Sequence, residues 1–487
     1  MSSKAAHKIG IVWFRQDLRL SDNPALKAAI AECEQVVPVF IDDPTDGTIS
    51  SIGEASRAWL HHALASLAQS LEEHDNELLI RQGDPLTELE VLLADTAATA
   101  VYWNRAYDPA TKTRDSAIKS ALSESVQVTS CNGLLLVEPW HLAKGDGSPY
   151  RVFTPFWRRL LAMLSEQDLK PLAAPRKGTL ERRAKVTAKL AIADLGLLPE
   201  RDWGESMMSY WAPGEKAAAK QLSRFLKQQV TDYDEQRDIP SVEGTSRLSP
   251  SLHTGEISAR QVMFAIQSTG ADITEKGTGI EAYAREIGWR EFATHLIYHF
   301  PDTVSEPLDS RFSRFPWAPD NKTTRDKLQR WQRGMTGVPI VDAGMRELYA
   351  TGWMHNRVRM VVASYLVKNL LIPWQRGEAW FRHTLVDADV ASNVMGWQWA
   401  AGSGADAAPF FRIFNPVLQG EKFDKAGEYV RHWVPELDSV PNRFIHKPWE
   451  LPKSDQPADY PSPLVDLKAS REEALAAFST IKLPQQQ

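Results

Sequence analysis

The sequence has few cysteines and no long apolar segment, and each shortage excludes a class of protein. Cys33 and Cys131 are the only cysteines in 487 residues. Two cysteines cannot build the disulfide framework of a small secreted domain, and they cannot supply a zinc site without several histidines. No run of about 18 apolar residues is present, which argues against a membrane-spanning helix. Residues 1–7 lack the apolar core of a signal peptide. We therefore expect a cytoplasmic protein with no membrane partner and no metal.

Charge of one sign is not in large excess either. The formal net charge is −6, which argues against a protein that coats nucleic acid. A local basic patch that contacts a few phosphates remains compatible with this charge. Tryptophan, by contrast, is abundant, with 17 residues. These residues can be core anchors, stacking platforms or an electron path, and their positions must decide between these roles.

The first part of the chain alternates short apolar runs with helical patterns. Apolar runs at 9–14, 36–41, 77–80 and 100–103, and a fifth within 126–137, predict five strands. Strands that alternate with helices are typical of a parallel sheet covered on both faces. We therefore predict a Rossmann-like α/β domain over residues 8–140.

A different pattern follows. Residues 141–213 contain a Gly- and Pro-containing loop and a charged stretch at 170–189, which predict an interdomain linker. Beyond residue 214 strand signals nearly vanish. Helical periodicity covers residues 214–230, 258–268, 280–298, 338–351, 356–371 and 378–384. Residues 214–487 are therefore predicted to form an all-α domain.

Two helical segments of that domain carry unusual residues. Asn356 and Met360 are four apart and share a helical face, after a Gly-Trp-Met-His start that is poor for a generic helix. An ordinary N-terminus capped by His355 or Asn356 is the simpler interpretation. Glu286 and Trp289 are three apart, which places a carboxyl group beside an aromatic plate. For an isolated pair, a surface glutamate next to a core tryptophan is the alternative.

Two further segments are informative. Trp397 and Trp399 are two apart, so on a helix they point roughly 200° apart, and one can face a cavity while the other faces the protein body. Asp387 and Asp389 precede them as helix caps or as acceptors for hydroxyl groups. The loop at 245–249 offers hydroxyl donors before a helix, which suits a phosphate or an ordinary cap.

Taken together, these motifs resemble the photolyase/cryptochrome family, and specifically its bacterial cyclobutane pyrimidine dimer photolyases. The resemblance spans nearly the whole chain, in family order, through VWFRQDLRLSDNPAL, TSRLS, WREF, TGVPIVDAGMREL, GWMHNRVRM, GWQWAAGSGADAAPFFRIFNP and FNPVLQGEKFD. It implies light-driven repair of cyclobutane dimers in UV-damaged DNA. In this reaction photoexcited, reduced FAD passes an electron to a flipped-out dimer, which splits into two pyrimidines. It further implies a monomeric carbon–carbon lyase with one FAD per chain.

The resemblance also implies residue roles. The FAD phosphates are assigned to Tyr233, Thr245, Ser246, Arg247, Leu248 and Ser249, and the ribityl or adenine side to Asp387, Ala388 and Asp389. Arg359 resembles the partner of Asp387, and Asn393 resembles the residue that faces flavin N5. Trp397, Trp374 and Trp317 resemble a tryptophan relay that reduces the flavin in light.

The lesion is expected to lie between Trp289 and Trp399, with Asn356 and Met360 facing it and Glu286 hydrogen-bonded to a thymine carbonyl. These five residues and Asn393 are the expected catalytic residues. Contacts to the DNA backbone are assigned to Arg237, Arg357 and Gln419, and they should make binding weaker at high salt.

Several alternatives stay open. The Asn-Glu pair of the common folate-binding mode is replaced by Ala110-Thr111, so we expect methenyltetrahydrofolate bound in another way, ahead of a deazaflavin or no antenna. A signalling cryptochrome is disfavoured by the short segment 452–487. A (6-4) photoproduct enzyme is disfavoured because a single histidine, His355, precedes Asn356. A plain nucleotide-binding α/β protein would leave the tryptophan-rich half unexplained.

Overall fold

The computed structural model describes residues 6–44, 52–180, 190–199, 202–407 and 411–482. Within it the chain divides into two compact units. Unit 1 comprises residues 1–204, 211–230 and 246–301, and unit 2 comprises residues 205–210, 231–245 and 302–487. The predicted linker at 141–213 includes residues 181–189 and 200–201, which lie outside the described residues. The domain boundaries derived from the sequence stay a prediction.

Unit 1 contains a parallel sheet of five strands. These are β1 His7–Phe14, β2 Cys33–Asp42, β3 Leu79–Gln82, β4 Ala100–Asn104 and β5 Gln127–Cys131. Their order is β3-β2-β1-β4-β5, and all four pairings are parallel. The predicted parallel sheet is therefore confirmed.

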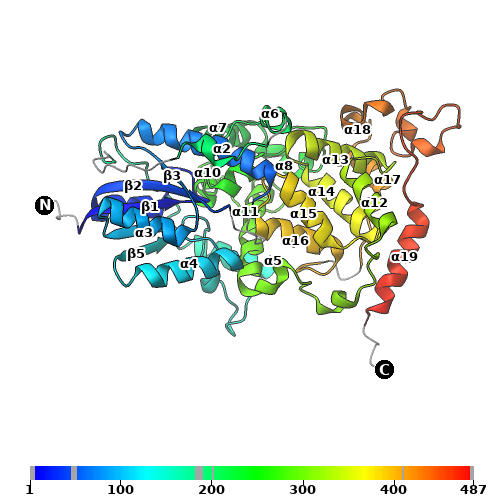
Figure 1. Cartoon of the computed structure of the whole chain (residues 1–487). Coiled ribbons are helices and arrows are strands. Elements are labelled where there is room, and N and C mark those ends of the chain that lie inside the picture. The colour runs from blue at the N-terminus through cyan, green and yellow to red at the C-terminus, as the bar shows by residue number, and fades with distance from the viewer. Residues whose placement is uncertain (1–5, 45–51, 181–189, 200–201, 408–410, 483–487) are drawn as a thin grey trace. The chain divides into compact units, whose positions relative to one another are not determined.

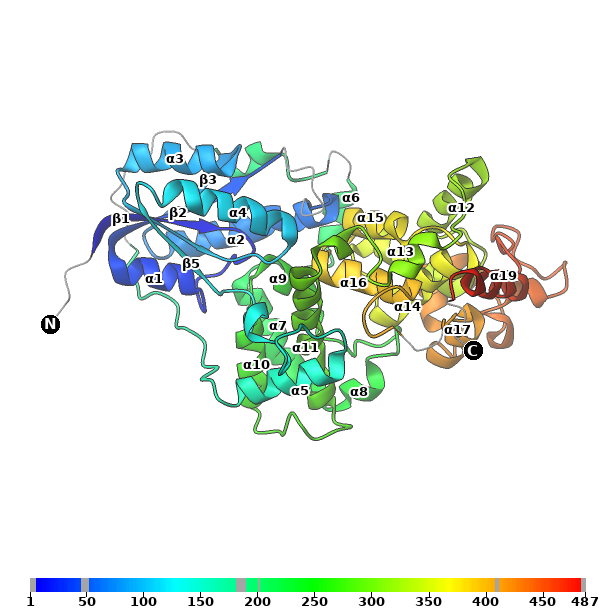
Figure 2. The same ribbon diagram turned by 90° about the horizontal axis from the view of Figure 1, so that it is seen from below.

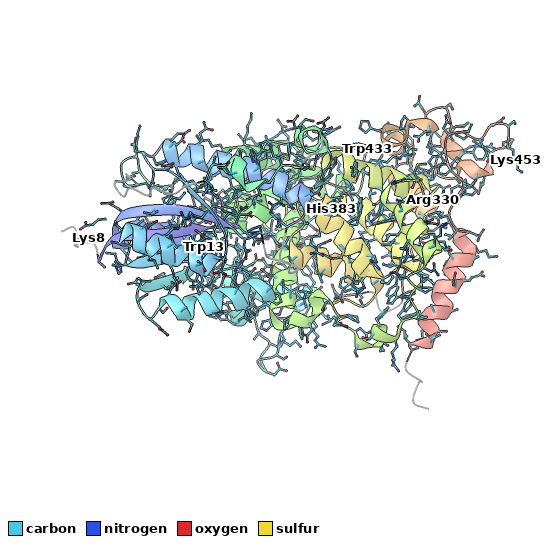
Figure 3. All side chains as sticks on the ribbon, in the orientation of Figure 1. Lys8, Trp13, Arg330, His383, Trp433 and Lys453 are labelled. Carbon is cyan, nitrogen blue, oxygen red and sulfur yellow. The ribbon has the colours of Figure 1, made fainter. Side chains whose placement is uncertain are left out.

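Helices cover both faces of this sheet. They are α1 Pro24–Glu32, α2 Glu54–Glu72, α3 Pro85–Thr96 and α4 Pro109–Leu122. The N-caps of α1, α3 and α4 are Asn23, Asp84 and Asp108, and each is followed by proline, which has no backbone N–H to leave unpaired. In Figure 1, α3 and α4 lie on one face of the sheet and α2 on the other. Trp13 of β1, which Figure 3 marks, belongs to the same buried apolar cluster as Leu89 of α3.

The rest of unit 1 is helical. Its main helices are α5 Phe153–Leu164, α7 Glu215–Gln228, α9 Ser249–Thr254, α10 Ala259–Gln267 and α11 Gly279–His299. Helix α5 was not predicted, because it lies in the segment assigned to the linker. Its Phe153, Phe156 and Leu160 are buried and it packs against α11, so this part of the segment belongs to the folded core.

Unit 2 is built from helices. They are α8 Tyr233–Gln236, α12 Lys322–Gln332, α13 Pro339–Thr351, α14 Asn356–Ser364, α15 Trp374–Thr384, α16 Val390–Ala401, α17 Pro416–Phe423, α18 Glu428–Trp433 and α19 Leu467–Thr480. Helix α6, Trp203–Met208, begins at the end of unit 1. The described residues of unit 2 form no strand, and the prediction of a helical C-terminal half is confirmed. Helices α14, α15 and α16 pack together, as both ribbon views show (Figures 1 and 2).

One predicted helix is wrong in its second half. The pattern at 356–371 predicts a continuous α-helix, but α14 ends at Ser364 and a buried π-helical turn follows over Tyr365–Asn369. Such turns inside α-helices are frequent at functional sites. The contacts of this turn are tertiary, so the local sequence carries no signal for it.

Candidate active site

The turn before α14 is held from two directions. Helix α13 ends at Thr351 and is followed by Gly352, whose φ of +68° is a left-handed conformation that glycine adopts without strain. The side chain of His355 then caps α14 by accepting a hydrogen bond from Arg357 N at 3.3 Å. The Glu347 carboxylate accepts hydrogen bonds from His355 N at 3.1 Å and from the Tyr429 hydroxyl at 2.6 Å. The capping interpretation of His355 is confirmed, while sequence reasoning missed Glu347 and Tyr429.

Asn356 is the first residue of α14 after this turn, and Met360 lies one helical turn further along the same helix. Asn356 is exposed and Met360 is half-buried one turn later. The face that they share on α14 is therefore not filled by the core of unit 2, unlike the face of Val358 and Val361, which are buried. A ligand can reach both side chains.

An ion pair joins α14 to the segment before α16. The Arg359 guanidinium donates to both carboxylate oxygens of Asp387 at 2.9 and 3.1 Å, and its Nε donates to Met354 O at 2.7 Å. Asp387 is 8% exposed. The pairing expected from the sequence is present, and it holds the segment before α16 against α14.

Helix α16 starts with a strong cap. The Asp389 side chain accepts a hydrogen bond from Ser392 N at 2.8 Å, and Ala388 before it is buried. Asn393, one turn into the helix, donates from Nδ2 to the Glu378 carboxylate at 3.0 Å. Burial raises the pKa of Glu378, and Arg382 pairs with the same carboxylate at 3.3 Å. The amide of Asn393 is thus held in one orientation by Glu378, a residue that the sequence gave no reason to select.

The two tryptophans of α16 have different surroundings, as their spacing predicts. The Trp397 ring is buried, with Phe381 edge-on at 4.9 Å and Trp331 edge-on at 6.1 Å. It leaves no room for a Cβ atom at Gly377. Trp399 is half-buried, lies 6.3 Å from the ring of Phe414 and lines a cavity. One indole therefore faces the protein body and the other a cavity.

The remaining members of the predicted relay lie in the same unit. Trp374 is 2% exposed and begins α15. Trp317 is half-buried, and its ring lies 4.4 Å from that of Phe315. Their role in electron transfer stays a prediction. Trp331, which touches Trp397, was not singled out in the sequence.

In unit 1, helix α11 carries Glu286 and Trp289. Both are half-buried, one turn apart. The Trp289 ring stacks on Phe153 with centroids 3.6 Å apart and planes within 8°, so α5 supports one face of this indole. Deeper in α11, Glu291 accepts a hydrogen bond from Leu136 N at 2.8 Å, which ties the helix to the chain after the sheet. The predicted carboxyl and aromatic pair thus sits on a rigid support.

The predicted phosphate loop also has a defined conformation. The carbonyl of Ser246 accepts a hydrogen bond from Gln221 Nε2 of α7 at 3.0 Å, and its hydroxyl accepts one from Leu248 N at 3.4 Å, so the loop lies against α7. Arg247 is exposed with a φ of +49° and lies over the Trp211 ring at 5.9 Å. Leu248 is buried, and exposed Ser249 begins α9. Phosphate binding by these residues stays a prediction.

The remaining predicted contacts belong to unit 2. Tyr233 is buried, with the Arg237 guanidinium 5.2 Å above its ring, and Thr245 is half-buried. Arg357 pairs with Asp238 at 2.6 Å and lies over the Phe423 ring at 4.5 Å. Gln419 is half-buried on α17. Arg357 therefore already has partners within the chain, and DNA contacts of these residues stay predictions.

The residues around α14 to α16 fit a flavin dinucleotide. An oriented asparagine amide, a paired aspartate and the cap of α16 offer donors and acceptors of the kind that flavin and ribityl groups need, beside an electron-rich indole. Among the described residues, no cluster of three or more His, Cys, Asp or Glu side chains could hold a metal ion. No helix in the described ranges is both long enough and apolar enough to span a bilayer.

Comparison with known proteins agrees with this fit. Residues 10–176 match the family model described as DNA photolyase, and residues 283–480 match the FAD binding domain of DNA photolyase. The chain is 46% identical to a deoxyribodipyrimidine photo-lyase of Agrobacterium fabrum over 97% of this chain and 98% of that protein. It is 39% identical to cryptochrome-2 of Arabidopsis thaliana over 96% of this chain and 78% of that protein.

A solved structure gives the same result. A bacterial class III photolyase from Agrobacterium tumefaciens superposes with a TM-score of 0.90 at 45% identity, covering 99% of both chains. Sequence and architecture agree over nearly the full length of these relatives, and the chain belongs to the DNA photolyase/cryptochrome family.

Proposed function

We propose that this protein uses blue light and reduced FAD to split cyclobutane pyrimidine dimers in DNA. The observation that carries the proposal is the arrangement on α16, where Asn393 is oriented by Glu378, Trp397 is buried and Trp399 lines a cavity. The full-length similarity to a deoxyribodipyrimidine photo-lyase supports the same activity.

The flavin-binding residues act by orientation. Glu378 holds the Asn393 side chain by its Nδ2, which leaves the amide oxygen as the group available to flavin N5. The Arg359–Asp387 ion pair fixes the chain that addresses the ribityl and adenine side. Tyr233 and residues 245–249 supply the phosphate contacts. When bound, reduced FAD supplies under light the electron that opens the cyclobutane ring and then regains it.

The lesion-binding residues act by stacking and hydrogen bonding. Trp289 and Trp399 clasp the extruded dimer, because stacking on an aromatic plane replaces the stacking lost on leaving the duplex. Asn356 and Met360 face the dimer from α14, and Glu286 hydrogen-bonds a thymine carbonyl. Arg237, Arg357 and Gln419 contact the DNA backbone, so we expect dimer affinity to fall as salt rises.

The finer properties follow the same proposal. We place the protein in the cytoplasm as a monomer. We assign methenyltetrahydrofolate as the antenna, ahead of a deazaflavin or no antenna, since Ala110-Thr111 replaces the pair of the common folate mode. The absorption spectrum of the chromophores released by denaturation tests this assignment.

The activity is tested with three oligonucleotides that carry a cyclobutane dimer, a (6-4) photoproduct or no damage. The holoprotein is photoreduced, mixed with each and illuminated with blue light. We expect the cyclobutane dimer to be cleared and the (6-4) product to remain. Clearance of the (6-4) product alone would reassign the substrate. A flavin that photoreduces while both lesions persist would identify a signalling cryptochrome.

A further inference from the structure

A lysine is buried beside the cavity of Trp399. Lys368 lies in the π-helical turn after α14 and is 1% exposed. It makes no ion pair with any described residue, and burial lowers the pKa of its amine well below the ordinary value. An ammonium removed from water without a counter-charge is expensive, whereas a methionine of similar shape would carry no such cost. The contacts that the lysine does make must therefore offset this penalty.

Among the described residues, two contacts stabilise the Lys368 ammonium. Nζ donates to Ala401 O at 2.8 Å, and it lies 3.0 Å from the centre of the Phe411 ring. Ala401 is the last residue of α16, so its carbonyl belongs to the negative end of the helix dipole. The ring adds a cation–π interaction, which is strongest where water is excluded. One ammonium thus joins the end of α16 to the loop that follows it.

The same ammonium borders a cavity that Trp399 lines. Lys368, Ser364, Trp399 and Phe411 all contribute to the walls of this cavity of about 70 Å³. Ser364 Oγ accepts a hydrogen bond from Phe414 N at 3.3 Å, so the start of the π-helical turn also holds the loop. Trp399 lies two residues before Ala401, within the helical turn that Lys368 caps.

Trp397 on the same helix is held differently. Its ring is fixed by Phe381, Trp331 and Gly377, which lie on α15 and α12. None of these contacts involves Lys368. Loss of the lysine should therefore disturb the cavity side of α16 and leave the buried side in place.

We propose that Lys368 is a positioning residue for lesion binding: by capping α16 and holding Phe411, it fixes the indole of Trp399 for stacking on an extruded base. This inference rests on the proposed function. It also gives the π-helical turn a role, because Lys368 lies in that turn and its Nζ reaches the last carbonyl of α16. The gain that offsets the cost of burying the charge is thus a fixed orientation of Trp399.

The test compares three variants of the holoprotein. Lys368→Met removes the charge and the hydrogen bond. Lys368→Arg keeps both, and the cavity gives room for the larger side chain. Ser470→Ala is the matched control, because it removes the hydrogen bond of 2.9 Å from Asn369, the neighbouring residue of the same turn, to α19.

We expect Lys368→Met to weaken binding of a dimer-containing oligonucleotide about tenfold, the loss that one hydrogen bond and one cation–π contact predict. Binding of undamaged DNA, flavin content and the rate of flavin photoreduction should stay unchanged. Lys368→Arg should recover most of the affinity, and Ser470→Ala should bind as the wild type. Equal losses in Lys368→Met and Ser470→Ala, or loss of flavin together with affinity, would reduce the lysine to a general stabilising role and overturn the proposal.

A second readout needs no DNA. The amides of Gly402, Ser403 and Gly404 donate to carbonyls of the last turn of α16. Their hydrogen exchange should accelerate in Lys368→Met, while amides of α15 exchange as before. Unchanged exchange would refute the inference even if repair is confirmed. Wild-type protein that fails to prefer dimer-containing DNA would instead refute the proposed function and leave this structural result standing.

Discussion

The central strands of unit 1 and helices α14 to α16 of unit 2 differ in the kinds of side chain that they bury. Strands β1 and β2 bury almost entirely apolar residues, such as Ile11–Phe14 and Val36–Ile41. The helices and the turn between them bury Lys368, Glu378 and Gln398, each with a specific partner. Burial of apolar side chains stabilises a fold but does not fix the orientation of each side chain. A buried polar group, in contrast, must meet its hydrogen-bond partner at a defined distance and angle. The sheet therefore supports the fold, and the helices orient chemical groups.

The largest effect separating the two regions is expected for Trp397→Phe. Phenylalanine fills much of the same space but is far harder to oxidise, so light-driven reduction of the bound flavin should be lost while the protein stays folded. The change in flavin absorbance during illumination measures this. Trp433→Phe on α18 is the matched control and should photoreduce normally (Figure 3 marks Trp433). Normal photoreduction in Trp397→Phe would remove this residue from the relay.

A second variant breaks an ion pair within the helical region. Arg359→Ala leaves the Asp387 carboxylate buried without its partner, which should lower the free energy of unfolding by about 3–5 kcal/mol. Flavin should also be lost during purification, as the ratio of flavin to protein absorbance will report. Arg325→Ala removes an exposed pair with Asp320 and should change stability by less than about 0.5 kcal/mol. Full flavin retention in Arg359→Ala would exclude a role of the ion pair in the flavin site.

A substitution in the sheet region should lower stability without affecting the flavin. Leu89→Ala opens a cavity in the cluster between α3 and the strands and should lower stability by about 3 kcal/mol. The flavin spectrum and the photoreduction rate of the folded protein should not change. Denaturant unfolding and illumination measure the two effects. A spectral change of the flavin in this variant would contradict the separation of roles.

The smallest expected effect concerns a buried acid of unit 1. Glu256 accepts hydrogen bonds from Gly214 N at 2.6 Å and from Trp59 Nε1 at 3.3 Å, and burial raises its pKa to about 7. The native state therefore holds this proton more tightly than the unfolded state. The contribution of Glu256 to the free energy of unfolding is therefore fully present below about pH 4.5. It declines as the pH rises toward about 7, by at most about 3 kcal/mol.

Glu256→Gln should abolish this decline. Melting temperatures measured at about pH 5 and pH 8 should then differ less in the variant than in the wild type. Equal pH dependence in both proteins would show that Glu256 does not titrate in this range.

The sequence predicts what local pattern determines. The five strands follow from short apolar runs, and the two surroundings of Trp397 and Trp399 follow from their spacing on a helix. The His355 cap follows from its place before Asn356. In each of these cases the determining residues are neighbours in the chain.

What depends on distant partners was missed. Glu378 was not selected because its partner Asn393 is 15 residues away, and Glu347 was missed because Tyr429 is 82 residues away. The π-helical turn occurs where the sequence periodicity predicts a continuous α-helix. Helix α5 escaped notice because prolines and loops surround it. Orientation of chemical groups therefore needs the structure, while their presence can be inferred from motifs.

The most direct test of the account is light-driven repair by protein whose flavin has been reduced chemically. Wild-type protein and Trp397→Phe are both reduced with dithionite, mixed with dimer-containing oligo-thymidine and illuminated. The account predicts that both clear dimers at the same rate in light and not in the dark, because the relay serves to reduce the flavin and takes no part in repair. Dimers that persist in the illuminated wild-type protein despite a fully reduced flavin would contradict it.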